Sequence, residues 1–286
     1  MGILFAFLAA ISWGVGDFLV QKSSRRFGDG PALLFVSGFA ALVLLPLVFK
    51  DIPTIFSGGL IWLFLLASFL VFVSSLFDYE GLRQGKVSVI EPVFSFEIVI
   101  AGVLSWILIG ETLNIWQIIL IFVLTFGLFF VSIKSFSHLK SIHTERGVWY
   151  AVLATIGVAC VSLTFAMAAR ETDPLLINWF SATAVFIFML FYLLWHRRFG
   201  EAISMWQKNK VLAFSVGFFT NFAWIAYATA ALYLPVAIVT GISEGYIALA
   251  VLLGLIFNKE KLKLHQKIGL IITLSTGICL AFISNF

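Results

Sequence analysis

Four carboxylic acids lie inside long apolar stretches of this sequence. They are Asp17, Glu91, Glu97 and Glu244, and Glu97 is one residue from the middle of its stretch. A charged side chain at the centre of a bilayer costs on the order of 3 kcal/mol even on the lenient insertion scale. A buried carboxylate therefore needs a proton, a cation or water. The four acids predict a polar cavity that exchanges protons or binds a cationic solute.

Basic residues are missing from the interior of the same stretches. A phosphorylated or nucleotide-linked substrate is normally held by buried arginine or lysine, so this substrate class is not favoured. All four histidines lie in loops, which leaves no spacing suited to a metal site. The sequence also lacks a P-loop for ATP and a nucleophile–base set, so we expect neither a cofactor nor an enzyme.

Polar and aromatic residues at helical spacing extend the candidate site. Trp13 lies one turn before Asp17, and Ser95 shares a helical face with Glu91, whereas Glu97 points about 120° away. The segments 74–79 and 221–228 add further polar and aromatic side chains. The candidate substrate-binding residues are Trp13, Asp17, Tyr79, Glu91, Ser95, Glu97, Asn221, Trp224, Tyr227 and Glu244. Packing or lipid contact is the alternative role for the aromatic residues, because 16% of the chain is aromatic.

The composition is that of an integral membrane protein. The 286 residues are 62% hydrophobic and 11% charged, with a mean hydropathy of +1.09, whereas about a quarter of the residues of soluble domains are charged. Apolar stretches of spanning length occur at about 2–20, 31–49, 58–77, 87–109, 113–133, 147–168, 174–195, 210–232, 235–257 and 264–284. Pro46 predicts a kink in the second stretch, and Asp173 before Pro174 is a helix-start signal. We therefore predict an all-α integral membrane protein with ten transmembrane helices.

The basic residues lie on one side of this topology. Sixteen of the 18 lysines and arginines fall in odd-numbered loops, against only Lys50 and Arg170 in even-numbered loops. The positive-inside rule then puts the odd loops in the cytoplasm and both termini outside the inner or plasma membrane. Because this orientation accounts for the net charge of +4, nucleic-acid binding is not expected.

The two halves of the chain show an internal repeat. A shift of 149 residues aligns Ser95 with Glu244, Leu104 with Leu253, Ile107 with Ile256, Glu111 with Glu260, Leu113 with Leu262 and Gln117 with Gln266. A shift of 145 residues takes Asp17 to Ser162 and Arg25 to Arg170. We expect the halves 1–139 and 140–286 to be inverted-topology repeats, because five helices in each half is an odd number of crossings. Many transporters have this design, with the substrate site at the interface between the repeats. Shared apolar composition is the alternative explanation.

A motif around the fourth and fifth helices occurs in both halves. It consists of an early proline, an acid, a leucine two positions later and a glutamine in the next helix: Pro92, Glu111, Leu113 and Gln117, then Glu260, Leu262 and Gln266. On this motif the chain resembles the ten-helix EamA-like branch of the drug/metabolite transporter superfamily. Gly241 replaces the second proline, so that helix is expected to bend differently. The family keeps both termini in the cytoplasm, whereas the loop charges here predict that they lie outside.

The resemblance implies a central cavity lined mainly by helices 1, 3, 4, 6, 8 and 9, and a transporter that exports its substrate. Glu111 and Glu260 lie at helix ends, where we expect each to cap the helix that follows rather than to bind substrate.

These features together predict a secondary active transporter of a small amine-containing metabolite, amino acid or lipophilic cation. Alternating access would be driven by proton antiport or by the gradient of the solute. The alternative is a translocator of a lipid or lipid-linked sugar. The expected partners are a small-molecule substrate, protons and membrane lipid, with the protein acting as a monomer or weak dimer.

Overall fold

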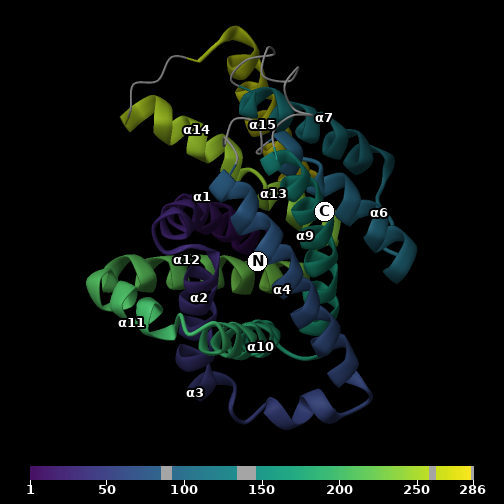
Figure 1. Ribbon diagram of the computed structural model, residues 1–286. Coiled ribbons are helices and arrows are strands. Elements are labelled where there is room, and N and C mark those ends of the chain that lie inside the picture. Colours follow the sequence, from purple (N-terminus) through teal and green to yellow (C-terminus); the bar gives the residue numbers. More distant parts are fainter. Residues whose placement is uncertain (85–91, 134–145, 258–261, 285–286) are drawn as a thin grey trace.

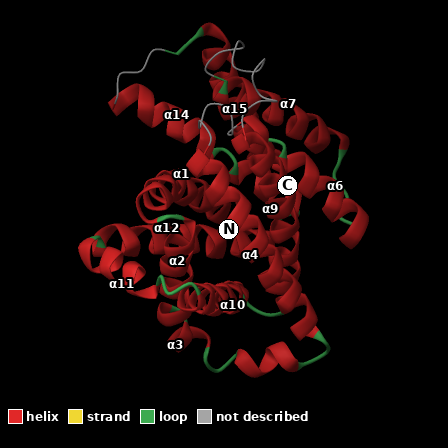
Figure 2. Ribbon diagram, viewed as in Figure 1, coloured by secondary structure: helices red, strands yellow, loops and turns green. Residues whose placement is uncertain are grey.

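The described parts of the chain fold into helices (Figures 1 and 2). In this computed structural model residues 1–84, 92–133, 146–257 and 262–284 are described, and every regular element within these ranges is a helix. The elements in chain order are α1 (Gly2–Phe27), α2 (Asp29–Val43), α3 (Leu45–Val48), η1 (Ile52–Phe56), α4 (Leu60–Gln84), α6 (Glu97–Ile109), α7 (Ile115–Ser132), α9 (Arg146–Glu171), α10 (Pro174–Trp195), α11 (Phe199–Lys208), α12 (Lys210–Ala231), α13 (Val236–Ser243), α14 (Tyr246–Phe257) and α15 (Leu264–Ile283).

Eight helices of the described residues are long and apolar enough to cross a membrane, which makes this a multi-pass membrane protein. The second and ninth predicted stretches instead form shorter apolar helices, Asp29–Val43 and Val236–Leu249. Pro46 explains the first interruption. The helix α2 ends at Val43 and α3 begins at Leu45, because a proline has no amide hydrogen with which to continue the preceding helix.

Two helices near the centre of the molecule are broken at equivalent positions. A turn at residues 95–96 divides the span Pro92–Ile109, and a turn at Glu244 and Gly245 separates α13 from α14. The two turns are 149 residues apart, which is the offset of the sequence repeat. We expected Gly241, which replaces the proline, to make the second helix bend differently from the first. Instead, the second helix breaks three residues after Gly241, just as the first breaks three residues after Pro92.

The same offset relates the helices that follow. The helix α7 begins with a capping box, in which Asn114 Oδ1 accepts from the Gln117 amide at 2.9 Å and Gln117 Oε1 accepts from the Asn114 amide at 3.0 Å. At the start of α15, Gln266 Oε1 accepts from the Lys263 amide at 3.1 Å. The glutamines of the sequence motif thus satisfy amide groups that a helix start leaves unpaired.

The long helices pack in pairs. The helix α1 lies against α12, α4 against α9, α7 against α15 and α2 against α10. In Figure 1 the α7–α15 pair and the α2–α10 pair occupy opposite ends of the molecule, with α1, α4, α9 and α12 between them. Small residues permit the close contacts. A Cβ atom on Gly269 of α15, for example, would lie 2.7 Å from the Val131 amide nitrogen of α7.

Polar contacts join loops of the same parity. On one face the Arg83 Nε atom, near the end of α4, lies 3.1 Å from Asp29 Oδ2 at the start of α2. On the other face Arg170, near the end of α9, bonds both Glu111, after α6, and the Ala231 carbonyl at the end of α12. Each of these described contacts therefore joins two loops of the same parity.

Candidate functional site

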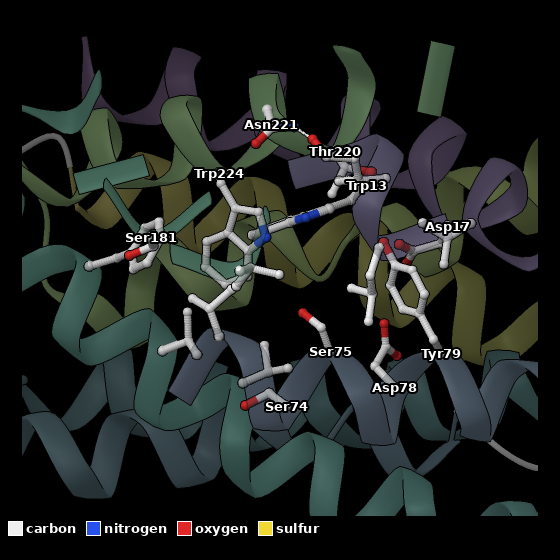
Figure 3. Close-up of a pocket in the computed structure, with 18 of the residues that line it drawn as sticks. Trp13, Asp17, Ser74, Ser75, Asp78, Tyr79, Ser181, Thr220, Asn221 and Trp224 are labelled. Atoms are coloured by element: carbon white, nitrogen blue, oxygen red, sulfur yellow. Dashed lines mark hydrogen bonds between the residues drawn. The ribbon is translucent and has the colours of Figure 1, made fainter. Parts of the chain in front are cut away.

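A cavity of about 140 Å³ lies among the helices at the centre of the molecule (Figure 3). Its walls come from α1, α2, α4, α9, α10 and α12, together with the two broken helices. The family resemblance implied six of these eight walls. The helices α2 and α10, which are the second and seventh crossings, line the cavity as well.

Seven of the ten predicted site residues line this cavity: Trp13, Asp17, Tyr79, Glu97, Asn221, Trp224 and Glu244. Figure 3 shows Asp17, Asp78 and Tyr79 at one end of the cavity, with Trp13 and Trp224 nearer its middle. Glu91 lies outside the described residues.

Ser95 and Tyr227 lie behind the cavity wall. The fully buried Ser95 hydroxyl donates to the Pro92 carbonyl at 2.8 Å, so it stabilises the turn that breaks the helix. The hydroxyl groups of Tyr227 and Thr240 are 2.8 Å apart and connect α12 to α13. Neither residue is among those that line the cavity.

Glu97 is held at the interface between the two halves of the chain. It is the first residue of α6, where the positive end of a helix favours a negative charge. Ser162 Oγ of α9 donates to Glu97 Oε1 at 2.9 Å. The carboxyl of Glu97 also hydrogen-bonds that of Glu244, and only 6% and 5% of the two residues are exposed. Two carboxyl groups from different halves of the chain thus meet in the cavity.

Asp17 occupies a comparable position on α1. Its carboxyl hydrogen-bonds the side chain of Tyr246, the first residue of α14. The offset of 145 residues takes Asp17 to Ser162, and the offset of 149 takes Glu97 to Tyr246. The Asp17–Tyr246 and Ser162–Glu97 contacts therefore join equivalent positions, with the carboxyl and the hydroxyl exchanged.

The charges that line the cavity are all of one sign. They are the carboxyl groups of Asp17, Asp78, Glu97 and Glu244, and no described residue of the lining is lysine, arginine or histidine. A solute that carries a positive charge would supply the compensating charge, as would protons on the acids.

Aromatic rings form one wall of the cavity. The Trp224 ring centroid lies 5.1 Å from that of Trp13 and 5.0 Å from that of Phe165. Tyr227 packs behind both tryptophans, at 5.6 Å from Trp13 and 5.7 Å from Trp224. The faces of such rings attract cations. The aromatic wall and the acids of the cavity together therefore suit a cation that also has an apolar part.

Asn221 has a structural role in addition to its place on the cavity wall. Its Nδ2 donates to the Val36 carbonyl of α2 at 3.0 Å and to the Gly217 carbonyl at 2.7 Å. Its Oδ1 accepts from Asn178 Nδ2 of α10 at 3.2 Å. Asn221 therefore joins three helices, and its hydrogen-bonding groups are used within the protein.

Sequence reasoning missed several lining residues. Tyr246, Phe165, Asn178 and Ser181 line the cavity but were not among the predicted site residues. Tyr246 had a usable signal, because the repeat offset aligns it with Glu97. Nothing in the sequence marks Phe165 among so many aromatic residues.

Glu111 caps a different helix from the one predicted. We expected it to cap the following helix, but α7 is capped by Asn114. Glu111 Oε2 instead accepts from the Val236 amide at the start of α13, at 2.8 Å. Its counterpart Glu260 lies outside the described residues.

Comparison with known protein families identifies the family of this chain. A model of the EamA-like transporter family matches residues 1–133 and 145–283. The chain belongs to the EamA-like transporter family. The resemblance to the drug/metabolite transporter superfamily is thereby confirmed, and the protein is a membrane transporter of that type. A family model that matches both parts of the chain is also consistent with the sequence repeat.

One similar solved structure is known simply as "Crystal structure of protein". It superposes with a TM-score of 0.72 at 14% sequence identity, over 99% of this chain and 97% of that chain. This likeness establishes a shared fold and says nothing of a substrate. No curated protein matches the sequence.

Proposed function

We propose that this EamA-like protein is a secondary active transporter of a small amine-containing metabolite, amino acid or lipophilic cation. The observation that carries the proposal is the cavity lined by four acids and, among its described residues, no base. The tryptophans beside the acids would hold the apolar part of such a solute. A volume of about 140 Å³ favours a small solute, since pockets for drug-sized ligands measure about 300–1,000 Å³.

The contact between Glu97 and Glu244 supports proton antiport as the driving mechanism. A hydrogen bond between two carboxyl groups requires a proton on one of them. An incoming ammonium group would compete with that proton for the same negative charge. Release of the proton on one side of the membrane, with binding of the cation, would couple the two fluxes.

Alternating access would arise from two inverted five-helix repeats, residues 1–139 and 140–286, which make up ten crossings. Three features support this arrangement: the broken helices 149 residues apart, the glutamines at the starts of α7 and α15, and the exchanged Asp17–Tyr246 and Ser162–Glu97 contacts. The halves would rock about the acids at their interface. We propose export as the direction, by analogy with the family, and a cytoplasmic location for the odd loops, from their charge.

Reconstituted protein tests the proposal. In proteoliposomes with an imposed pH gradient, the wild-type protein should exchange protons for phenethylamine, which is a small amine with an apolar ring, or for an amino acid. Glu244→Gln and Glu97→Gln should abolish this exchange and leave the protein folded. Glu201→Gln is the matched control, because Glu201 lies on the exposed surface of α11 and pairs only with Arg198 among the described residues. Unaltered transport with the same pH profile in Glu244→Gln would remove Glu244 from the mechanism.

The alternative is a translocator of lipids or lipid-linked sugars. It is less consistent with a small cavity whose lining includes four acids. The same proteoliposomes distinguish the two functions. Movement of a fluorescent phospholipid between leaflets, without proton–cation exchange, would favour the alternative.

A further inference from the structure

A second, apolar groove lies on the outer wall of the protein, away from the central cavity. It has a volume of about 720 Å³ and is bounded by α2, α10, α11 and α12. It shares no lining residue with the cavity, because α2 turns one face to each: Leu33, Val36 and Ser37 line the cavity, whereas Leu34 and Phe35 line the groove. The groove is therefore a separate site.

The groove has the length of one lipid leaflet. Its lining on α2 extends from Leu34 to Val43, which is about 14 Å at the helical rise of 1.5 Å per residue. Half of a typical hydrocarbon core is about 15 Å. Three of the apolar lining residues are well exposed: Leu42 and Val43 of α2, at 71% and 47%, and Phe214 of α12, at 61%. One acyl chain of a lipid fits these dimensions and this chemistry.

One end of the groove is positively charged. Lys210 is the single charged residue among the described residues that line it, and its Nζ lies 5.2 Å from the centroid of the Trp206 ring. A lysine ammonium held against a tryptophan face is favourably placed, and both residue types are typical of the membrane interface. The acid of this segment, Glu201, is paired with Arg198.

The helix that carries Trp206 has the features of an interfacial helix. The ten residues of α11 connect α10 to α12, with Ala202 buried against the protein and Glu201, Gln207 and Lys208 exposed. Trp195, just before this helix, is 86% exposed. A short amphipathic helix with basic and tryptophan residues lies at the level of the lipid headgroups.

We propose that this groove binds an anionic glycerophospholipid. Its phosphate would lie at the Lys210 ammonium, and one acyl chain would extend along the groove between α2 and α12. Charge complementarity selects an anionic headgroup, and the apolar length selects a long acyl chain. The site is independent of the transport function, because none of the cavity residues takes part.

Thermal unfolding and native mass spectrometry of the purified full-length protein test this proposal. Dioleoyl phosphatidylglycerol should raise the melting temperature and remain bound in the mass spectrum, whereas dioleoyl phosphatidylcholine should have a much smaller effect. Two further ligands separate the headgroup from the chain: dihexanoyl phosphatidylglycerol and inorganic phosphate should give little stabilisation.

Variants at two lysines then locate the site. Lys210→Gln should weaken binding of the anionic lipid about fivefold, as expected for one basic residue at an anionic headgroup. Lys210→Arg should retain binding, and Lys208→Gln is the matched control, since Lys208 is exposed and does not line the groove. Equal stabilisation by both dioleoyl lipids, or full binding by Lys210→Gln, would overturn the proposal. Strong stabilisation by phosphate alone would overturn the role of the acyl chain.

Discussion

Arg170 and Glu111 form an ion pair, 2.6 Å between Nη2 and Oε1, that joins the two parts of the chain matched by the family model. Arg170 also donates to the backbone carbonyls of Ala231 at 2.8 Å and Leu234 at 3.1 Å. Glu111 accepts from the Val236 amide with its other oxygen. The pair therefore ties the ends of α6, α9 and α12 and the start of α13 together on one face of the protein.

We predict that the loss of this pair destabilises the protein in a graded manner. Arg170→Ala removes several charge-assisted hydrogen bonds and should lower the free energy of unfolding by about 2 kcal/mol. Glu111→Gln should cost less than Glu111→Ala, because the amide oxygen of glutamine still accepts from the Val236 amide. Unfolding in detergent measures these values, and a double-mutant cycle isolates the pair. Additive effects of Arg170→Ala and Glu111→Ala would show that the two side chains do not interact.

The hydroxyl groups that hold the cavity acids should affect substrate binding more than folding. Tyr246→Phe removes the side-chain donor to Asp17, and Ser162→Ala removes the donor to Glu97. Each change should weaken binding of a cationic substrate about tenfold, as expected for a hydrogen bond to a charged group. Equilibrium binding of phenethylamine measures the effect. Tyr233→Phe is the control, because Tyr233 is 58% exposed in the turn after α12; an equal loss in this variant would refute specific positioning.

The aromatic wall predicts a preference for cations with an apolar part. Trp224→Leu should weaken binding of phenethylamine about tenfold, because it removes the aromatic contact in a desolvated site. Binding of a small aliphatic amine should change less. Trp62→Leu on α4 is the matched control, since Trp62 is 74% exposed. Similar losses for both ligands would argue against direct contact between Trp224 and the aromatic cation.

The contact between α7 and α15 should not tolerate an added methyl group. A Cβ atom on Gly269 would lie 2.7 Å from the Val131 amide nitrogen and 2.8 Å from the Gly127 carbonyl oxygen. Gly269→Ala should therefore cost roughly 1–3 kcal/mol of stability through overpacking. Gly277→Ala on the same helix has open space and should be neutral or stabilising. Equal melting temperatures for the two variants would contradict the close packing.

The loop charges predict which residues face the cytoplasm. In a background without Cys160 and Cys279, a cysteine at Ser57 should react with a membrane-impermeant maleimide in intact cells. A cysteine at Lys208 should react only after the membrane is permeabilised. The opposite pattern would place the termini in the cytoplasm, as is usual in the family.

The sequence alone determined the membrane class, the position of most helices and the chemistry of the cavity. Apolar stretches of spanning length identify membrane helices directly, because the energetic cost of burying polar groups in lipid is large. Acids inside such stretches predict a polar interior for the same reason. The repeat offset of 149 residues, which aligns Ser95 with Glu244, also relates the two positions at which the central helices break.

Only the tertiary structure decided which side chains meet. Helical periodicity identifies the face of a helix but neither its neighbour nor its crossing position. For this reason Tyr227, predicted for the cavity, lies behind the wall against Thr240, whereas Tyr246 lines the cavity and holds Asp17. Glu111 likewise caps α13, a helix distant in sequence, because the packing of α6 beside α13 brings that helix start within reach of its carboxylate.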